Sequence, residues 1–192
     1  MIRAFIAVDL DPQVIKRIDA AILQLKPNLP AVRWIPQANF HLTLKFLDAI
    51  REEQVDEIHA ALAEQLQPFS RCVISAKGLG VFPDSRRPRI LWVGVESDKL
   101  ALLAAQIETA LAPLGFAPEA RGFKAHLTIG RWREPSRVSR ELIAVLGKWR
   151  GAEFGQSTID TVNLFQSVLK PEGAEYRCLK TIPLAYEQPQ GS

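Results

Sequence analysis

The sequence predicts an α+β fold of two pseudo-symmetric lobes, each a mainly antiparallel sheet with helices on its outer face, with a site cleft between the sheets. Segments rich in β-branched and aromatic residues alternate with amphipathic helical segments along the 192 residues. A pattern of histidine, apolar residue, threonine and apolar residue occurs twice, beginning at residues 41 and 126, which are 85 residues apart. The repeat predicts one bilobal domain over 1–192, with lobe 1 at about 1–82, lobe 2 at about 89–186 and strands that can exchange between them.

The first half of the chain is expected to alternate strands with helices. Asp11 and Pro12 form a helix-start signal, since aspartate caps free N–H groups and proline fits the first helical position. Apolar residues then recur at helical spacing until Pro27 ends the pattern. The predicted strands are 2–8, 31–35, 41–46 and 71–77, with a turn at 36–39 between the second and third, and the predicted helices are 12–26 and 52–67.

The second half repeats this order. Residues 83–89, PDSRRPR, are basic and bounded by proline, so they are predicted to link the two halves. The predicted strands are 90–95, 124–129, 160–169 and 176–184, with a turn at 171–173, and the predicted helices are 100–111 and 136–148. Under the 85-residue shift, the strand near Phe5 falls on Ile90 and the helix near Val55 falls on Arg140.

Composition limits the classes of function. The 24 basic and 21 acidic residues give a net charge of +3, too small a surplus for a protein that coats nucleic acid, though compatible with a local anion site. Cys72 and Cys178 lack metal or redox spacing and indicate reduced thiols. The N-terminal apolar run is broken by Asp9 and no run reaches about 18 residues, so we expect no secretory signal, no membrane span and a cytoplasmic location.

The paired motif at 41–44 and 126–129 carries the chemistry. Residues two apart in a strand share a face, so His41 would lie beside Thr43, and His126 beside Thr128. A pseudo-twofold axis would bring these groups together across one cleft. Because free histidine has a pKa of about 6.5, one ring can accept a proton while the other donates one, and threonine hydroxyls can donate to phosphate oxygens. The pattern favours displacement at phosphorus and requires neither a metal nor another cofactor.

These residues resemble those of the two-histidine (2H) phosphoesterases, and among them the RNA 2',3'-cyclic phosphodiesterases historically called 2'-5' RNA ligases. The resemblance runs from RAFIAVDL through NFHLTLKFLD, FPDSRRPRILWVGV and FKAHLTIGRWR to SVLKPEGAEYRCL, which is nearly the whole chain. It implies a hydrolase that converts a terminal 2',3'-cyclic phosphate of RNA, with tRNA fragments among the RNAs to consider, to a 2'-phosphomonoester. It also implies weak, reversible 2'-5' joining, as in some relatives.

The same resemblance assigns roles to residues. His41 would donate a proton to the departing 3' oxygen, and His126 would be the base that activates water. Thr43 and Thr128 would bind the phosphate, with Arg131 as a further anion ligand. A chain that forms its own cleft needs no second subunit, so we expect a monomer.

The internal symmetry breaks directly after each motif, because residues 45–46 are Lys-Phe where residues 130–131 are Gly-Arg. Phe46, Trp132 and Tyr176 are candidates for stacking on a terminal base, with core packing as the competing interpretation.

Three other functions stay open. A phosphodiesterase for a small cyclic nucleotide would use the same chemistry. A non-catalytic RNA-binding module would be expected to have exposed aromatic residues on its sheet face, at positions where this chain has histidine and threonine. A metal hydrolase would need a third ligand beside the two histidines, and no local spacing provides one. His59 is expected to pack at the edge of the apolar face of its helix, and the arginines of 83–89 to be a solvated linker that can steer RNA.

Overall fold

The structure is a computed structural model that describes residues 1–119, 122–133, 139–171 and 173–185. Its helices are α1 (Pro12–Leu25), α2 (Gln54–Leu66), α3 (Leu100–Leu111) and α4 (Arg140–Trp149), with short 3-10 turns η1 (Lys26–Asn28), η2 (Gln37–Asn39) and η3 (Ala112–Leu114). Its strands are β1 (Ile2–Val8), β2 (Val32–Trp34), β3 (Leu42–Ile50), β4 (Cys72–Phe82), β5 (Ile90–Glu96), β6 (His126–Trp132), β7 (Glu153–Ile159), β8 (Thr161–Lys170) and β9 (Gly173–Pro183).

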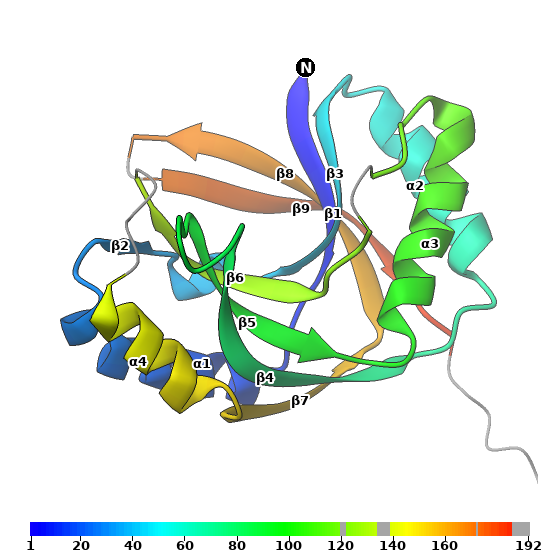
Figure 1. Ribbon diagram of the computed structural model, residues 1–192. Coiled ribbons are helices and arrows are strands. Elements are labelled where there is room, and N and C mark those ends of the chain that lie inside the picture. Colours follow the sequence, from blue (N-terminus) through cyan, green and yellow to red (C-terminus); the bar gives the residue numbers. More distant parts are fainter. Residues whose placement is uncertain (120–121, 134–138, 172, 186–192) are drawn as a thin grey trace, which may run out of the picture.

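The strands form two sheets whose neighbouring strands run antiparallel (Figure 1). The first sheet has four strands in the order β3-β1-β8-β9, and the second has five in the order β2-β6-β5-β4-β7. Two antiparallel sheets with accompanying helices confirm the predicted α+β class.

Each sheet takes strands from both halves of the sequence. β4 follows the first motif but pairs with β5, and β8 follows the second motif but pairs with β1. Residues 83–89 do not separate two sheets, because Phe82 pairs with Ile90 and the Arg89 N–H donates to the Phe82 carbonyl at 2.7 Å. They form the loop of the β4–β5 hairpin. Since β4 and β8 are related by the 85-residue shift, this exchange preserves the pseudo-twofold relation.

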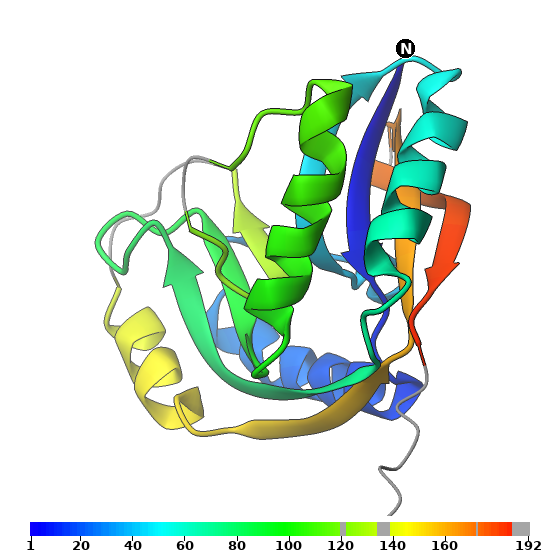
Figure 2. The ribbon, with the colours of Figure 1, turned by 90° about the vertical axis from the view of Figure 1, so that its right-hand side faces the viewer.

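Two helices pack on each sheet. α2 packs against β9 and α3 against β3, while α1 packs against β7 and α4 against β4. Figure 2 shows α1 (blue) and α4 (yellow) near the base of the molecule, and α3 (green) and α2 (cyan) above them. Helices, like strands, are therefore exchanged, since α1 follows β1 in the chain but packs on the other sheet.

Helix α1 shows why most predicted elements are confirmed to within a few residues. The Asp11 carboxylate accepts from the Gln13 N–H at 2.7 Å, and Pro12 occupies the first helical position. The apolar residues of its sequence pattern lie on the buried face, with Val14 and Ile18 almost fully enclosed.

Four strands differ from what the sequence suggested. β4 continues to Phe82 instead of ending near residue 77. The prediction did not include β7, because the sequence of this strand, EFGQSTI, is mostly polar or small and buries few apolar side chains. The segments at 31–35 and 41–46 do not pair with each other: β2 joins β6, and β3 joins β1. The predicted helix start at 136 and Glu172 of the predicted turn lie outside the described residues; α4 begins at Arg140.

The two motif strands meet although they belong to different sheets. Cα atoms of β3 and β6 come within 8 Å of one another. The apolar residues of both motifs are buried in the main core, as predicted, and are Leu42, Leu44, Leu127 and Ile129. One core thus supports both histidine motifs from behind.

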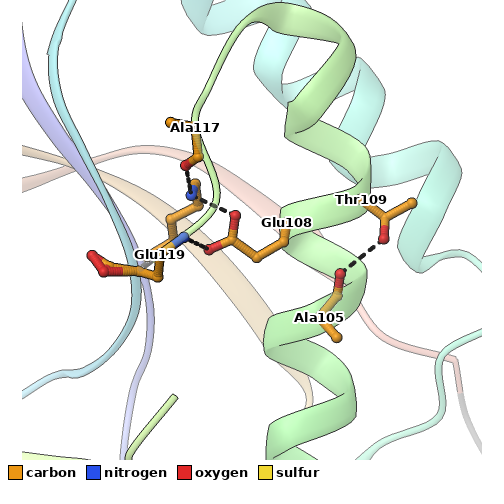
Figure 3. A network of polar contacts seen from close by, with 6 residues as sticks. Ala105, Glu108, Thr109, Ala117 and Glu119 are labelled. Atoms are coloured by element: carbon orange, nitrogen blue, oxygen red, sulfur yellow. Dashed lines mark hydrogen bonds and ion pairs between the residues drawn. The ribbon is translucent and has the colours of Figure 1, made fainter. Parts of the chain in front are cut away.

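A buried ion pair joins the first motif strand to the second half of the chain. Lys45 of β3 is 3% exposed, and its Nζ donates to Glu108 Oε2 at 2.6 Å and to the Ala117 carbonyl at 2.8 Å. Glu108 also accepts from the Glu119 N–H at 3.3 Å. Figure 3 shows Glu108 on α3 facing both Ala117 and Glu119. The network fixes α3 and the segment after it against β3.

Candidate active site

A β-bulge in the second motif decides which side chains share the face of His126. Thr128 pairs with Trp92, but Gly130 pairs with the next residue, Leu91, so Ile129 is an extra residue in β6. Alternation therefore shifts by one place, and Arg131 returns to the face of His126 and Thr128. Without the bulge, Arg131 would point into the core.

The first motif has the same irregularity at the same place. Thr43 pairs with Ala7 and Lys45 pairs with Ile6, so Leu44 is the extra residue of β3. Lys45 thereby turns toward the core, and the following residue, Phe46, shares the face of Thr43. Phe46 and Arg131 are thus equivalent positions, one aromatic and one cationic.

The difference between Lys45 and Gly130 follows from the unequal sheets. β2 adds a strand beside β6, and a Cβ on Gly130 would lie 2.4 Å from a methyl carbon of Val32 on β2. β3 is an edge strand of its sheet, so Lys45 has room to reach α3. The extra strand β2 therefore explains why the two motifs diverge at this position.

An aromatic cluster supports His41. The ring of His41 meets Phe165 edge-on at a centroid distance of 4.4 Å, and Phe165 stacks on Phe5 at 5.3 Å. Tyr176 is half-buried, with its ring centroid 5.6 Å from that of His41. Phe46 lies at the edge of this cluster and is 60% exposed. The cluster holds the imidazole in a fixed orientation and leaves one aromatic face open.

His126 is held by a backbone carbonyl and by one aromatic ring. Its Nδ1 lies 2.7 Å from the Lys124 carbonyl, so this nitrogen carries the hydrogen and Nε2 is left for chemistry. Phe82 meets the ring edge-on at 4.9 Å. Phe82 in turn packs on Trp92, whose ring lies so close to Gly80 that a Cβ there would sit 2.1 Å from it.

His41 has a different polar environment. Its Nε2 lies 3.3 Å from Asp9 Oδ1, and the other Asp9 oxygen accepts from Asn163 Nδ2 at 2.9 Å. The Nδ1 atom of His41 is buried, and within the described residues it has no hydrogen-bond partner of good geometry. Asn39 stands two residues before His41, as Lys124 stands two residues before His126. The sequence analysis did not propose Asp9 as a site residue. The available signal was a charged residue directly after a buried apolar strand.

The two histidines are tuned by neighbours of opposite charge. Burial lowers the pKa of His41 below its ordinary value, whereas the Asp9 carboxylate and, to a smaller extent, the Asn39 backbone raise it. Burial also lowers the pKa of His126; the Lys124 carbonyl opposes this effect and the Arg131 guanidinium adds to it. Asp9 thus favours an imidazolium at His41, and Arg131 favours a neutral ring at His126.

The structure places the other predicted site residues in different surroundings. Thr43 and Thr128 are half-buried on the faces of their histidines, and Arg131 is exposed. Trp132 is buried in the main core and so is not a stacking surface. In the described part of the chain, no group of three or more histidine, cysteine or acidic residues is arranged to hold a metal ion. Among the same residues, no helix has the length and apolarity to cross a membrane.

Comparison with known proteins agrees with the internal repeat. The sequence profile described as LigT-like phosphoesterase matches twice, at residues 8–92 and 93–176. The chain belongs to this family. The two matches of this LigT-like phosphoesterase begin 85 residues apart, the same spacing as its two histidine motifs.

Two curated relatives align with most of this LigT-like phosphoesterase. A protein of Archaeoglobus fulgidus named RNA 2',3'-cyclic phosphodiesterase is 34% identical over 180 residues, covering 93% of this chain and 98% of the relative. One of Aquifex aeolicus with the same name is 37% identical over 147 residues, covering 75% and 77%.

Solved structures share the fold. The crystal structure of a Thermus thermophilus protein superposes with a TM-score of 0.82 at 25% identity, covering 97% of this chain and all of that one. E. coli LigT complexed with 3'-AMP superposes with a TM-score of 0.76 at 22% identity, covering 95% and 98%, which shows a common fold.

Proposed function

We propose that this LigT-like phosphoesterase hydrolyses the terminal 2',3'-cyclic phosphate of RNA to a 2'-phosphomonoester by acid–base catalysis between two histidines. The observation that carries the proposal is the pair of motif histidines with neighbours of opposite charge: Asp9 lies 3.3 Å from His41 Nε2, and Arg131 shares the strand face of His126. Burial lowers the pKa of both rings, but the Asp9 carboxylate favours the protonated form of His41 and the Arg131 guanidinium favours the neutral form of His126, which suits a donor and an acceptor. The relatives named RNA 2',3'-cyclic phosphodiesterase support the choice of substrate.

The reaction follows from these protonation states. Neutral His126 takes a proton from water as the water oxygen bonds to phosphorus, and protonated His41 gives a proton to the departing 3' oxygen as its bond to phosphorus breaks. Thr43 and Thr128 donate hydroxyl hydrogen bonds to the phosphate oxygens, and Arg131 adds charge-assisted ones. This scheme runs without a metal. With a 5'-hydroxyl in place of water, the same groups would join two RNA ends weakly through a 2'-5' bond, with the 3' oxygen again leaving. The reverse of this step would cleave that bond.

The exposed aromatic residue supplies a place for the terminal base. Phe46 is 60% exposed beside the cluster that contains His41, and Tyr176 is half-buried in it. Bases of single-stranded RNA stack on such rings with little sequence preference. We infer that RNA ends, including those of tRNA fragments, are the substrates, and that a monomer acts on them in the cytoplasm. A small cyclic nucleotide offers the same phosphate and is the second candidate.

The test is direct. The purified protein is incubated in EDTA with a short RNA that ends in a 2',3'-cyclic phosphate and, separately, with a 2',3'-cyclic mononucleotide, and the phosphate position of each product is identified. We expect a 2'-phosphate, formed faster from the RNA. Faster turnover of the mononucleotide would favour the second candidate, and activity that appears after metal is supplied would contradict the metal-free scheme.

The pH dependence is predicted from the same neighbours. Burial lowers the pKa of both histidines from 6.5, while activity needs His41 protonated and His126 neutral. We therefore expect a bell-shaped profile of kcat/KM, which reports the free enzyme, with an optimum on the acid side of pH 6.5. A profile that rises steadily through pH 6.5 would contradict these assignments.

Arg131→Met should weaken turnover and shift the profile. Loss of a charged hydrogen-bond donor to phosphate corresponds to about 10–100-fold in kcat/KM. Because Arg131 lowers the pKa of His126, its removal raises that pKa and moves the acidic limb of the profile to higher pH. The control is Arg133→Met, an exposed arginine two residues later. Equal effects of both variants would point to general loss of positive charge.

A further inference from the structure

We propose that Asp9 is the positioning residue that favours the protonated, proton-donating form of His41, and that Gly94, its equivalent in the second lobe, leaves His126 without such a partner. The proposal rests on the function proposed above and assigns the residue that decides which histidine is the acid.

The position of Asp9 is fixed from two sides. It directly follows β1, and its Oδ1 faces His41 Nε2 at 3.3 Å. Asn163 of β8 is 4% exposed and donates through Nδ2 to the other oxygen at 2.9 Å. Asn163 stands opposite Ala7, which also pairs with Thr43, so one row across three strands aligns the amide with the first motif. A carboxylate accepts hydrogen bonds and donates none, so it selects the ring form that carries hydrogen on Nε2.

The second lobe lacks this feature. Gly94 lies 85 residues after Asp9 and pairs with His126 across β5 and β6. A Cβ on Gly94 would lie 2.6 Å from the Lys77 carbonyl oxygen, so the backbone leaves no room for a side chain there. An acidic residue therefore stands beside one histidine and is sterically excluded beside the other. The pseudo-symmetric pair is made unequal at this position, and again where Phe46 is replaced by Arg131.

Asp9 is also the charged group in contact with His41. The ring meets Phe5 at a centroid distance of 6.4 Å, Phe165 at 4.4 Å and Tyr176 at 5.6 Å. The phenylalanines carry no charge, and Tyr176 meets the imidazole through a T-shaped ring contact. Within the described residues, the charge that acts on this imidazole near neutral pH thus comes from Asp9. The Asp9 side chain is 56% exposed, so solvent reaches the His41–Asp9 pair.

The experiment compares the full-length chain with Asp9→Asn, which keeps shape and removes charge. Because Asp9 raises the pKa of His41, that pKa should fall in the variant. The alkaline limb of the kcat/KM profile, where His41 loses its proton, should therefore move to lower pH. We expect about tenfold lower kcat/KM at about pH 8 and a much smaller loss at about pH 5.5. Titration of the His41 Cε1–H resonance by NMR should shift to lower pH as well.

Two further variants make the result decisive. Asp160→Asn removes an exposed carboxylate that lines the same depression of about 480 Å³ as Asp9, and it should leave the His41 titration unchanged. Asn163→Ala keeps the charge of Asp9 but removes the hydrogen bond that holds its carboxylate. It should move the His41 titration to lower pH, by less than Asp9→Asn does. A urea midpoint for each variant checks that it folds.

A His41 resonance that titrates identically with and without the Asp9 charge would overturn the proposal. An equal loss of kcat/KM at both pH values would also overturn it, since a merely structural role has no pH signature. If the unchanged chain hydrolyses no cyclic phosphate, the proposed function fails while the NMR titration still decides the role of Asp9.

Discussion

Alanine in place of His41 or His126 should lower kcat/KM for a 2',3'-cyclic phosphate end by about 10²–10⁴-fold, because in the proposed mechanism each ring transfers one of the two protons. Each histidine is half-buried and touches aromatic rings, so the loss should come without unfolding. The measurement is single-turnover hydrolysis at the pH optimum, with denaturation curves recorded for each variant.

His59→Ala is the matched control. His59 lies on α2, which packs against β9 and α3, away from both motif strands, so its replacement should leave turnover unchanged. In the double variant His41→Ala/His126→Ala, the losses should not multiply, because a donor and an acceptor that act in one step fail together. A single alanine variant that retains most of its activity would remove that histidine from the mechanism.

Lys45→Met should destabilise the protein by about 3 kcal/mol, near the lower end of the range for breaking a buried ion pair. Lys45 is 3% exposed and Glu108 is 25% exposed, so the substitution leaves one partly enclosed carboxylate without its cation. The Ala117 carbonyl loses its donor at the same time. Urea denaturation measured at neutral pH gives the free energy of unfolding.

A second substitution separates charge from packing. Lys45→Met/Glu108→Gln removes the uncompensated carboxylate and should recover part of the lost stability. Lys16→Met, on the exposed side of α1, should change the free energy of unfolding by less than about 0.5 kcal/mol. If Lys45→Met matched this control, the ion pair would contribute nothing to stability.

Most helices and strands could be predicted because neighbouring residues in the sequence specify them. The Asp11-Pro12 start and the spacing of Val14 and Ile18 specify α1 without reference to the rest of the chain. The repeated motif predicted both histidine strands, with Leu42 and Leu127 buried behind them. The catalytic roles of the motif residues remain predictions.

Partners of strands were harder to foresee, since they depend on contacts between distant residues. The short connection from Phe82 to Ile90 favours a hairpin, but the strong basic character of 83–89 pointed instead to a link between lobes. The bulges at Leu44 and Ile129 leave no trace in the pattern of apolar residues. Without them, neither the inward turn of Lys45 nor the return of Arg131 to the face of His126 could be predicted.

The exchange of β4 and β8 gives the chain an interlaced architecture. Either half alone would leave open sheet edges, so we expect that halves produced separately would be insoluble and that the whole chain unfolds in a single transition. Two identical halves assembled around a twofold axis would present two histidines with the same surroundings. Covalent fusion removes that constraint, because each copy can diverge independently. In the proposed mechanism, the direction of proton transfer through the site is thus a property that the joined chain has and that a symmetric pair of halves would lack.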